Sequence, residues 1–136
     1  RVASGESLSL REDSLDWSGW AMESRIYAED SENFYPSPGK IVSYIEPRGE
    51  RIRVDSGYQA GDTVSQFYDP LIAKLVIWGE DRNKAITKMQ HALDDYEITG
   101  IKNNIPFLRK AFDSNIYKSG NYDTHFISKL KEGKNG

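Results

Sequence analysis

Hydrophobic and polar positions alternate from residue 20 onward, which predicts a β-strand near the start of the folded part of the chain. One face of this strand is mostly apolar and carries Trp20, Met22, Ser24, Ile26 and Ala28. The opposite face is polar, with Glu23, Arg25 and Tyr27. Because successive side chains of a strand point to opposite sides, the pattern predicts one face against a core and one face in water.

Two further strands are expected, one on either side of a turn. Residues 47–50, Pro-Arg-Gly-Glu, have turn chemistry and separate two short segments at about residues 41–46 and 51–55. Ile52 and Val54 are expected to face inward. The turn and its flanks together predict a β-hairpin.

The most apolar segment of the chain is residues 71–78, which carry a polar side chain only at Lys74. Such a run is typical of a central strand that is covered on both faces. Asp69-Pro70 precedes it and favours an extended conformation at Asp69. One more short strand is expected around Ile98, before Gly100.

Helices are predicted in the second half of the chain. Ile86, Met89, Leu93 and Tyr96 recur at helical spacing, and Asp81 is placed to cap the first turn of that helix.

A second helix is expected from residue 105, after a cap at Asn103 or Asn104. A loop over residues 113–121 then leads to a short segment around residues 124–130.

These elements predict an α+β fold, an antiparallel β-sheet with helices packed against it, the strands coming first and the helices later. Residues 1–18 are interpreted as the end of a preceding helix, closed by Gly5, followed by a polar linker. The folded domain is expected over residues 19–130 and a disordered tail over residues 131–136. A chain that opens on the end of a helix indicates a longer parent protein.

Composition narrows the function classes. The 136 residues are 38% hydrophobic and 29% charged, the balance of one globular domain. A net charge of −3 gives no basic field for nucleic acid or an anionic membrane, and no apolar run approaches the ~20 residues that span a bilayer. The chain has no cysteine, which excludes disulfides, thiolate zinc sites and cysteine nucleophiles.

Familiar catalytic motifs are missing from the sequence. It contains no GxxxxGK[ST] or GxGxxG phosphate loop, no GxSxG elbow and no HExxH pair. His91 and His125 lie far apart, so no metal site is expected. From these residues alone the chain is predicted to be a structural or binding domain.

Arg25 admits two interpretations. It could form an exposed ion pair with Glu23, worth at most about 1 kcal/mol. Alternatively, its planar guanidinium could bind a flat anion such as bicarbonate. Residue type alone favours the ion pair.

Four other residues, at three places in the chain, could have structural roles. Asp69 is expected to accept hydrogen bonds from the turn that follows it. His125 and Thr124 lie at a helix start, which attracts anions but is equally explained as a capping segment. Arg53 lies on a strand face that is expected to be solvated, with a subunit contact as the lesser interpretation.

Five segments, in order and with matching gaps, resemble the C-terminal domain of biotin carboxylases. They are GWAMESRIYAED at 19–30, PSPGKI at 36–41, IRVDSG at 52–57, YDPLIAKL at 68–75 with Trp78-Gly79, and GIKNN at 100–104. Residues 92–98 and 104–109 further resemble the α subunits of acyl-CoA carboxylases, propionyl-CoA carboxylase above all. Acetyl-CoA, methylcrotonyl-CoA and two-subunit pyruvate carboxylases share the domain, so the acyl substrate stays open.

The resemblance implies a ligase of fatty acid metabolism that uses ATP and bicarbonate to carboxylate biotin, the first half-reaction of acyl-CoA carboxylation. The matching position makes Arg25 the residue that holds bicarbonate and stabilises the ureido enolate oxygen. Asp69 is implied to bind or organise groups at the same site, Thr124 and His125 to lie near the adenine of ATP, and Arg53 to contact another subunit. The turn before Arg53 lacks an aromatic residue that some homodimeric members carry, which puts the homodimer in doubt.

The resemblance also implies partners. ATP and Mg²⁺ are expected on an ATP-grasp domain that follows an N-terminal domain of the same parent chain, and biotin on a separate carrier domain. A carboxyltransferase subunit is a further partner. The protein is expected in the cytoplasm or, in a eukaryote, in the mitochondrial matrix. The fragment alone is expected to be inactive. The alternative is a non-catalytic α+β interaction module of the same ancestry.

Overall fold

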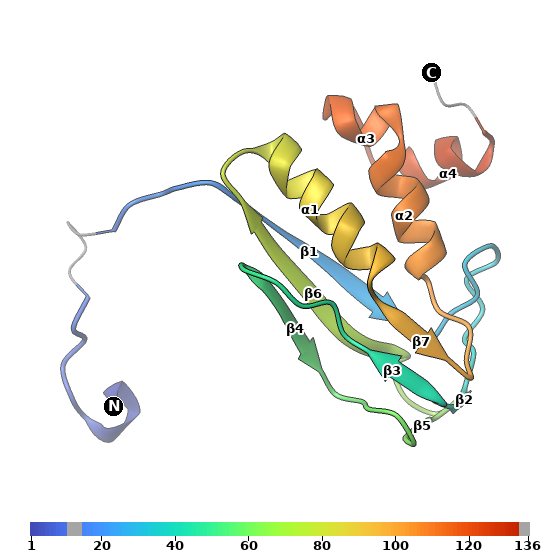
Figure 1. Cartoon of the computed structure of the whole chain (residues 1–136), viewed down its shortest axis with the longest axis horizontal. Helices are drawn as coiled ribbons and strands as arrows, with labels where there is room; N and C mark the ends of the chain where they lie inside the picture. The colour runs from blue at the N-terminus through green and yellow to red at the C-terminus, as the bar shows by residue number, and fades with distance from the viewer. Residues whose placement is uncertain (11–14, 134–136) are drawn as a thin grey trace.

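A computed structural model describes residues 1–10 and 15–133 and shows a sheet layer with helices on one side (Figure 1). The elements are η1 (Val2–Ser4), β1 (Trp20–Tyr27), β2 (Gly39–Lys40), β3 (Ser43–Ile45), β4 (Ile52–Ser56), β5 (Thr63–Val64), β6 (Leu71–Gly79), α1 (Arg82–Asp94), β7 (Glu97–Thr99), α2 (Ile105–Asp113), α3 (Asn115–Ser119) and α4 (Phe126–Lys131). The α+β prediction is confirmed. Part of the predicted linker and the end of the predicted tail fall outside the described residues.

The largest sheet has the antiparallel order β1-β6-β4. As predicted, the apolar segment is the central strand, and Leu75 and Ile77 are buried against the helices. β1 buries Ser24 and Ile26 on the same side and leaves Glu23 and Arg25 exposed. The alternation in the sequence therefore assigned both faces of β1 correctly.

The predicted hairpin of residues 41–55 is wrong. β3 pairs with β7, with Tyr44 opposite Ile98, whereas β4 pairs with β6, with Val54 opposite Leu75. The turn at residues 47–50 reverses the chain, but the two strands enter different sheets. Turn chemistry sets only the reversal, because pairing is decided by which strand lets Ile52 and Val54 pack against the core.

α1 packs across the sheet as the spacing of its apolar residues predicts. Asp81 caps it by accepting a hydrogen bond from the backbone N–H of Lys84 at 2.8 Å. Ile86, Met89 and Leu93 are buried in one core with β1 and β6. Each such side chain contributes about 1.5–3 kcal/mol through burial.

The short strand predicted around Ile98 is present as β7, which follows α1 and pairs back with β3. The predicted loop at 113–121 contains a short helix, α3. Ser114 caps this helix by accepting from the N–H of Tyr117, whose ring packs edge-on against Phe112. A five-residue helix is too short to leave a periodic signal in the sequence.

Candidate functional site at the open face of the sheet

The β1-β6-β4 sheet has one side that faces away from the helices (Figure 1), and two of the predicted site residues, Arg25 and Arg53, lie on its strands. The strand register places Arg25 opposite Lys74, which in turn lies opposite Asp55. The neighbouring row is Glu23, Val76 and Arg53. We call these two rows the open face. Arg25 and Arg53, far apart in the sequence, therefore lie on one surface.

Arg25 stands at the solvent side of β1, with 57% of its side chain exposed. Its Nε lies 3.2 Å from Glu23 Oε1, so the predicted ion pair is present. Hydrogen bonding to the Tyr27 side chain, and then to Glu23, holds the pKa of Arg25 above its usual value. The guanidinium is thus permanently charged, and an incoming anion could reach it.

Asp69 lies just before β6, at the end of the sheet where β1 finishes. Its Oδ1 accepts a hydrogen bond from the backbone N–H of Leu71 at 2.8 Å, which is the structural role predicted from its turn. The Asp69 carboxylate also approaches Glu29. Burial, followed by the charge of Asp69, raises the pKa of Glu29. This influence of Asp69 on Glu29 was not predicted from the sequence, because the two residues come from separate loops.

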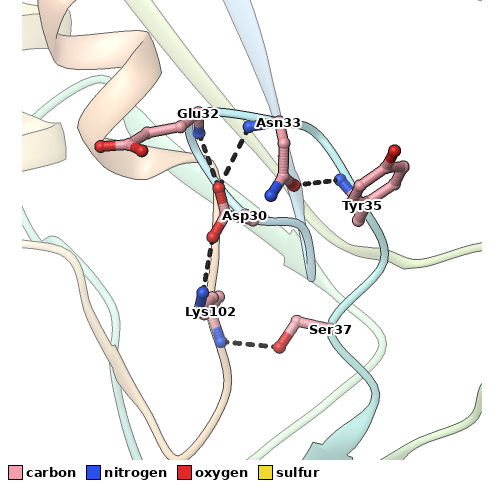
Figure 2. Close-up of polar contacts among 6 residues, drawn as sticks. All are labelled: Asp30, Glu32, Asn33, Tyr35, Ser37 and Lys102. Atoms are coloured by element: carbon pink, nitrogen blue, oxygen red, sulfur yellow. Dashed lines mark hydrogen bonds and ion pairs between the residues drawn. The ribbon is translucent and has the colours of Figure 1, made fainter.

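Hydrogen bonds connect the loop that follows β1 to the segment that precedes α2 (Figure 2). Asp30 accepts hydrogen bonds from the backbone N–H groups of Glu32 and Asn33, at 2.9 and 3.1 Å, and its other oxygen lies 2.7 Å from Lys102 Nζ. The hydrogen bond from Lys102, followed by the two backbone bonds, lowers the pKa of Asp30 to about 2. The Ser37 hydroxyl accepts from the N–H of Lys102 and adds a second tie.

Asn104 lies between α2 and β1 and is 7% exposed. Its Nδ2 donates to the carbonyl of Arg25 at 3.0 Å, and its Oδ1 accepts from the N–H of Tyr27 at 2.8 Å. The sequence had offered Asn103 or Asn104 as the helix cap. The capping side chain is Asn103, which accepts from the N–H of Ile105 at 3.1 Å.

Thr124 and His125 lie elsewhere, at the start of α4 in the helical layer (Figure 1). Both are exposed, and Asp123 accepts a hydrogen bond from the N–H of His125 at 2.9 Å. This turn fits the predicted capping segment. The structure brings neither residue into contact with Arg25 or Asp69.

Arg53 is exposed on the open face, with its guanidinium 3.1 Å from Asp55. A surface cavity of about 550 Å³ lies between the end of the 47–50 turn, the end of β6 and α1. There the guanidinium of Arg51 stacks 4.1 Å above the Trp78 ring. None of the predicted site residues lines that cavity. Within residues 1–10 and 15–133, no three or more metal-ligating side chains come together, and no helix is long and apolar enough to cross a membrane.

Comparison with known proteins decides what this architecture is. The family model of the biotin carboxylase C-terminal domain matches residues 23–129. The chain belongs to that family. The resemblance of the five segments is therefore confirmed, and the biotin carboxylase C-terminal domain accounts for the sheet, the helices and the face that carries Arg25.

Several carboxylases contain a similar biotin carboxylase C-terminal domain. The mitochondrial propionyl-CoA carboxylase α chain of Caenorhabditis briggsae is 43% identical over 133 residues, and the mitochondrial methylcrotonoyl-CoA carboxylase subunit α of Glycine max 42% over 132. Each match covers 96% of this chain but 18% of the relative. Near-equal identities to enzymes named for two different acyl groups leave the acyl substrate undetermined.

A solved structure agrees with these relatives. The biotin carboxylase domain dimer of the 2-oxoglutarate carboxylase from Hydrogenobacter thermophilus, in complex with MgADP, ADP and bicarbonate, superposes with a TM-score of 0.90 at 34% identity. The match covers 96% of this chain and 30% of that one. The chain thus spans less than a third of the proteins it resembles.

Proposed function

We propose that this domain completes the biotin carboxylase active site of a biotin-dependent carboxylase, a ligase that carboxylates biotin with ATP and bicarbonate. The observation that carries the proposal is the exposed, permanently charged Arg25 on the open face. Its guanidinium can present parallel donors to bicarbonate and neutralise negative charge on the ureido oxygen of biotin. The bicarbonate in the related 2-oxoglutarate carboxylase domain supports this chemistry.

The remaining site residues take supporting roles in the proposal. Asp69 fixes the turn into β6 and, with Glu29, adds negative charge near the end of the sheet where β1 finishes. Thr124 and His125 would border the adenine of ATP. Arg53, exposed on the open face, would contact another subunit.

The partners of this domain are also part of the proposal. ATP and Mg²⁺ would be held by an ATP-grasp domain that follows an N-terminal domain of the same parent chain, since this chain has no phosphate-binding loop. Biotin would arrive on a carrier domain, and a carboxyltransferase subunit would use the product. The mitochondrial relatives support a mitochondrial location in a eukaryote, and a bacterial parent would act in the cytoplasm.

Arg25→Ala in the full-length parent tests this proposal. Loss of one preorganised donor to developing charge typically costs 10²–10³ in turnover, so we expect bicarbonate- and biotin-dependent ATP cleavage to fall about that far. Arg25→Lys should recover only part of it, because an ammonium group is a point charge without a second parallel donor.

Glu23→Ala is the matched control, since it removes the ion pair but keeps the guanidinium. We expect it to remain near full activity. Near-normal turnover by Arg25→Ala, or equal losses in both variants, would instead support a non-catalytic interaction module in which Arg25 serves only a surface ion pair.

A further inference from the structure

We propose that Asn104 is a positioning residue for Arg25, holding the strand backbone from which the guanidinium projects. The inference rests on the proposed role of Arg25. It assigns a function to a buried amide that reaches β1 from the start of α2, far along the chain.

Asn104 makes three hydrogen bonds to β1 at the site of Arg25. Its Nδ2 donates to the Arg25 carbonyl at 3.0 Å, and its Oδ1 accepts from the Tyr27 N–H at 2.8 Å. Its own backbone N–H donates to the Tyr27 carbonyl at 3.2 Å. All three lie on the edge of β1 that has no neighbouring strand in the β1-β6-β4 sheet. Asn104 therefore replaces a strand partner over these residues.

The backbone at this point needs a second support. The register between β1 and β6 shifts between Ile26 and Tyr27, so the ladder is irregular one residue beyond Arg25. A strand that is irregularly paired on one edge and open on the other can change its twist. The bonds from Asn104 fix the peptide groups on both sides of Ile26 and thereby fix the direction of the Arg25 side chain.

The amide suits this role better than a helix cap. Asn104 has no capping bond to α2, because Asn103 provides it. A cap needs only an acceptor, which serine or aspartate also offers. The bond to the Arg25 carbonyl and the bond from the Tyr27 N–H require a donor and an acceptor on one planar group, and the Asn amide supplies both without a change of protonation state.

Loss of the Asn104 hydrogen bonds is expected to displace the Arg25 guanidinium from its catalytic position. A shift of about 1 Å in a positioned group can cost on the order of 10²-fold in rate. We expect Asn104→Ala in the full-length parent to lower the kcat of bicarbonate- and biotin-dependent ATP cleavage by roughly 10- to 100-fold, with the KM for ATP unchanged. Asn104→Asp keeps the acceptor for Tyr27 but replaces the donor to Arg25 with an oxygen that faces the carbonyl, so a loss of kcat in the same direction is expected.

Asn103→Ala is the matched control, because it removes a neighbouring amide of equal size that caps α2 and does not touch β1. We expect it to lower the melting temperature at least as much as Asn104→Asp does, with little change in kcat. Hydrogen exchange gives a readout apart from activity. Exchange at the Tyr27 amide should accelerate in Asn104→Ala and stay unchanged in Asn103→Ala.

A double-mutant cycle separates the possible outcomes. If Asn104 acts through Arg25, Asn104→Ala should cause no further loss of kcat in an Arg25→Ala background. Equal losses in both backgrounds, or a loss matched by Asn103→Ala, would overturn the positioning role and leave the proposed function standing. Near-normal turnover by Arg25→Ala alone would overturn both. Should Asn104→Ala fail to fold, Asn104→Asp carries the same cycle.

Discussion

Single residues in this domain divide into those that hold the fold and those that face outward for chemistry. Arg25 touches only surface groups, so its removal leaves no cavity and is expected to leave the melting temperature nearly unchanged. Asn104 and Asp30 have the opposite character, since each ties its own segment to a distant one: Asn104 binds the backbone of β1, and Asp30 pairs with the side chain of Lys102. The alternation of β1 predicted that Arg25 lies on the polar face, and the resemblance to the family supplied its expected role. Neither could show which backbone a buried amide would bind.

Asp30 predicts a specific dependence of stability on pH. Its pKa of about 2 in the folded state lies below the ordinary 3.8, so its contribution is complete above about pH 4 and disappears as the pH falls toward 2. We expect Asp30→Asn to lower the urea midpoint at pH 7 and to differ little from the wild type near pH 2. Asparagine can still accept the two backbone bonds, so the variant isolates the charge.

Urea titrations of both proteins at several pH values between 2 and 7 provide the measurement. A midpoint difference that stays constant over this range would show that the pairing with Lys102 does not lower the pKa of the Asp30 carboxyl. Added salt should reduce the difference at pH 7, because the Lys102 partner is exposed.

Elements were predictable wherever their signal is local. The alternation of β1, the apolar run of β6 and the stripe of α1 each place a strand or helix without reference to the rest of the chain. Pairing is a different matter, because the 47–50 turn gives no information on whether β4 prefers β3 or β6. The same limit explains why the influence of Asp69 on Glu29 was not predicted. The helix α3 was missed because it has fewer residues than two helical turns need.

Gly100 is the residue on which the junction of β7 with β2 and β3 depends. Its φ is +94°, and an added Cβ would lie 2.3 Å from the Lys40 carbonyl and 2.8 Å from the Val42 nitrogen. Gly61 has nearly the same φ, +97°, with open space around it. We expect Gly61→Ala to cost about 1–3 kcal/mol through backbone strain alone.

Gly100→Ala should cost that amount plus about 1–3 kcal/mol for the clash with backbone that cannot move aside. Chemical unfolding of the two variants measures the difference directly. Equal destabilisation by the two substitutions would mean that the backbone around Gly100 moves to accommodate a Cβ at little cost, which would contradict this prediction.

The described residues form a core, and the sequence contains none of the phosphate-loop motifs named above. Its buried residues connect α1 to all three strands of the main sheet, either directly or through packed neighbours, so we expect the purified 136-residue chain to unfold cooperatively. Phosphoryl transfer needs groups that clamp the phosphates and metal, and no such motif occurs in the sequence.

We therefore expect this chain alone neither to hydrolyse ATP nor to carboxylate free biotin. Calorimetry and a coupled ATPase assay on one preparation test both statements, with the full-length parent as the positive control. Bicarbonate- and biotin-dependent turnover by the fragment would contradict the assignment of ATP to another domain.

The pairing of β1 with β6 also determines when the sheet can form during synthesis. Trp20 lies opposite Gly79 and Tyr27 opposite Leu71, so β1 leaves the ribosome well before β6, the strand with which it pairs among the described residues. At typical rates of translation the interval is on the order of seconds, far longer than a hairpin needs to form. Throughout that time the apolar side of β1 has no partner, and a nascent chain of this domain is open to mispairing while translation is still in progress.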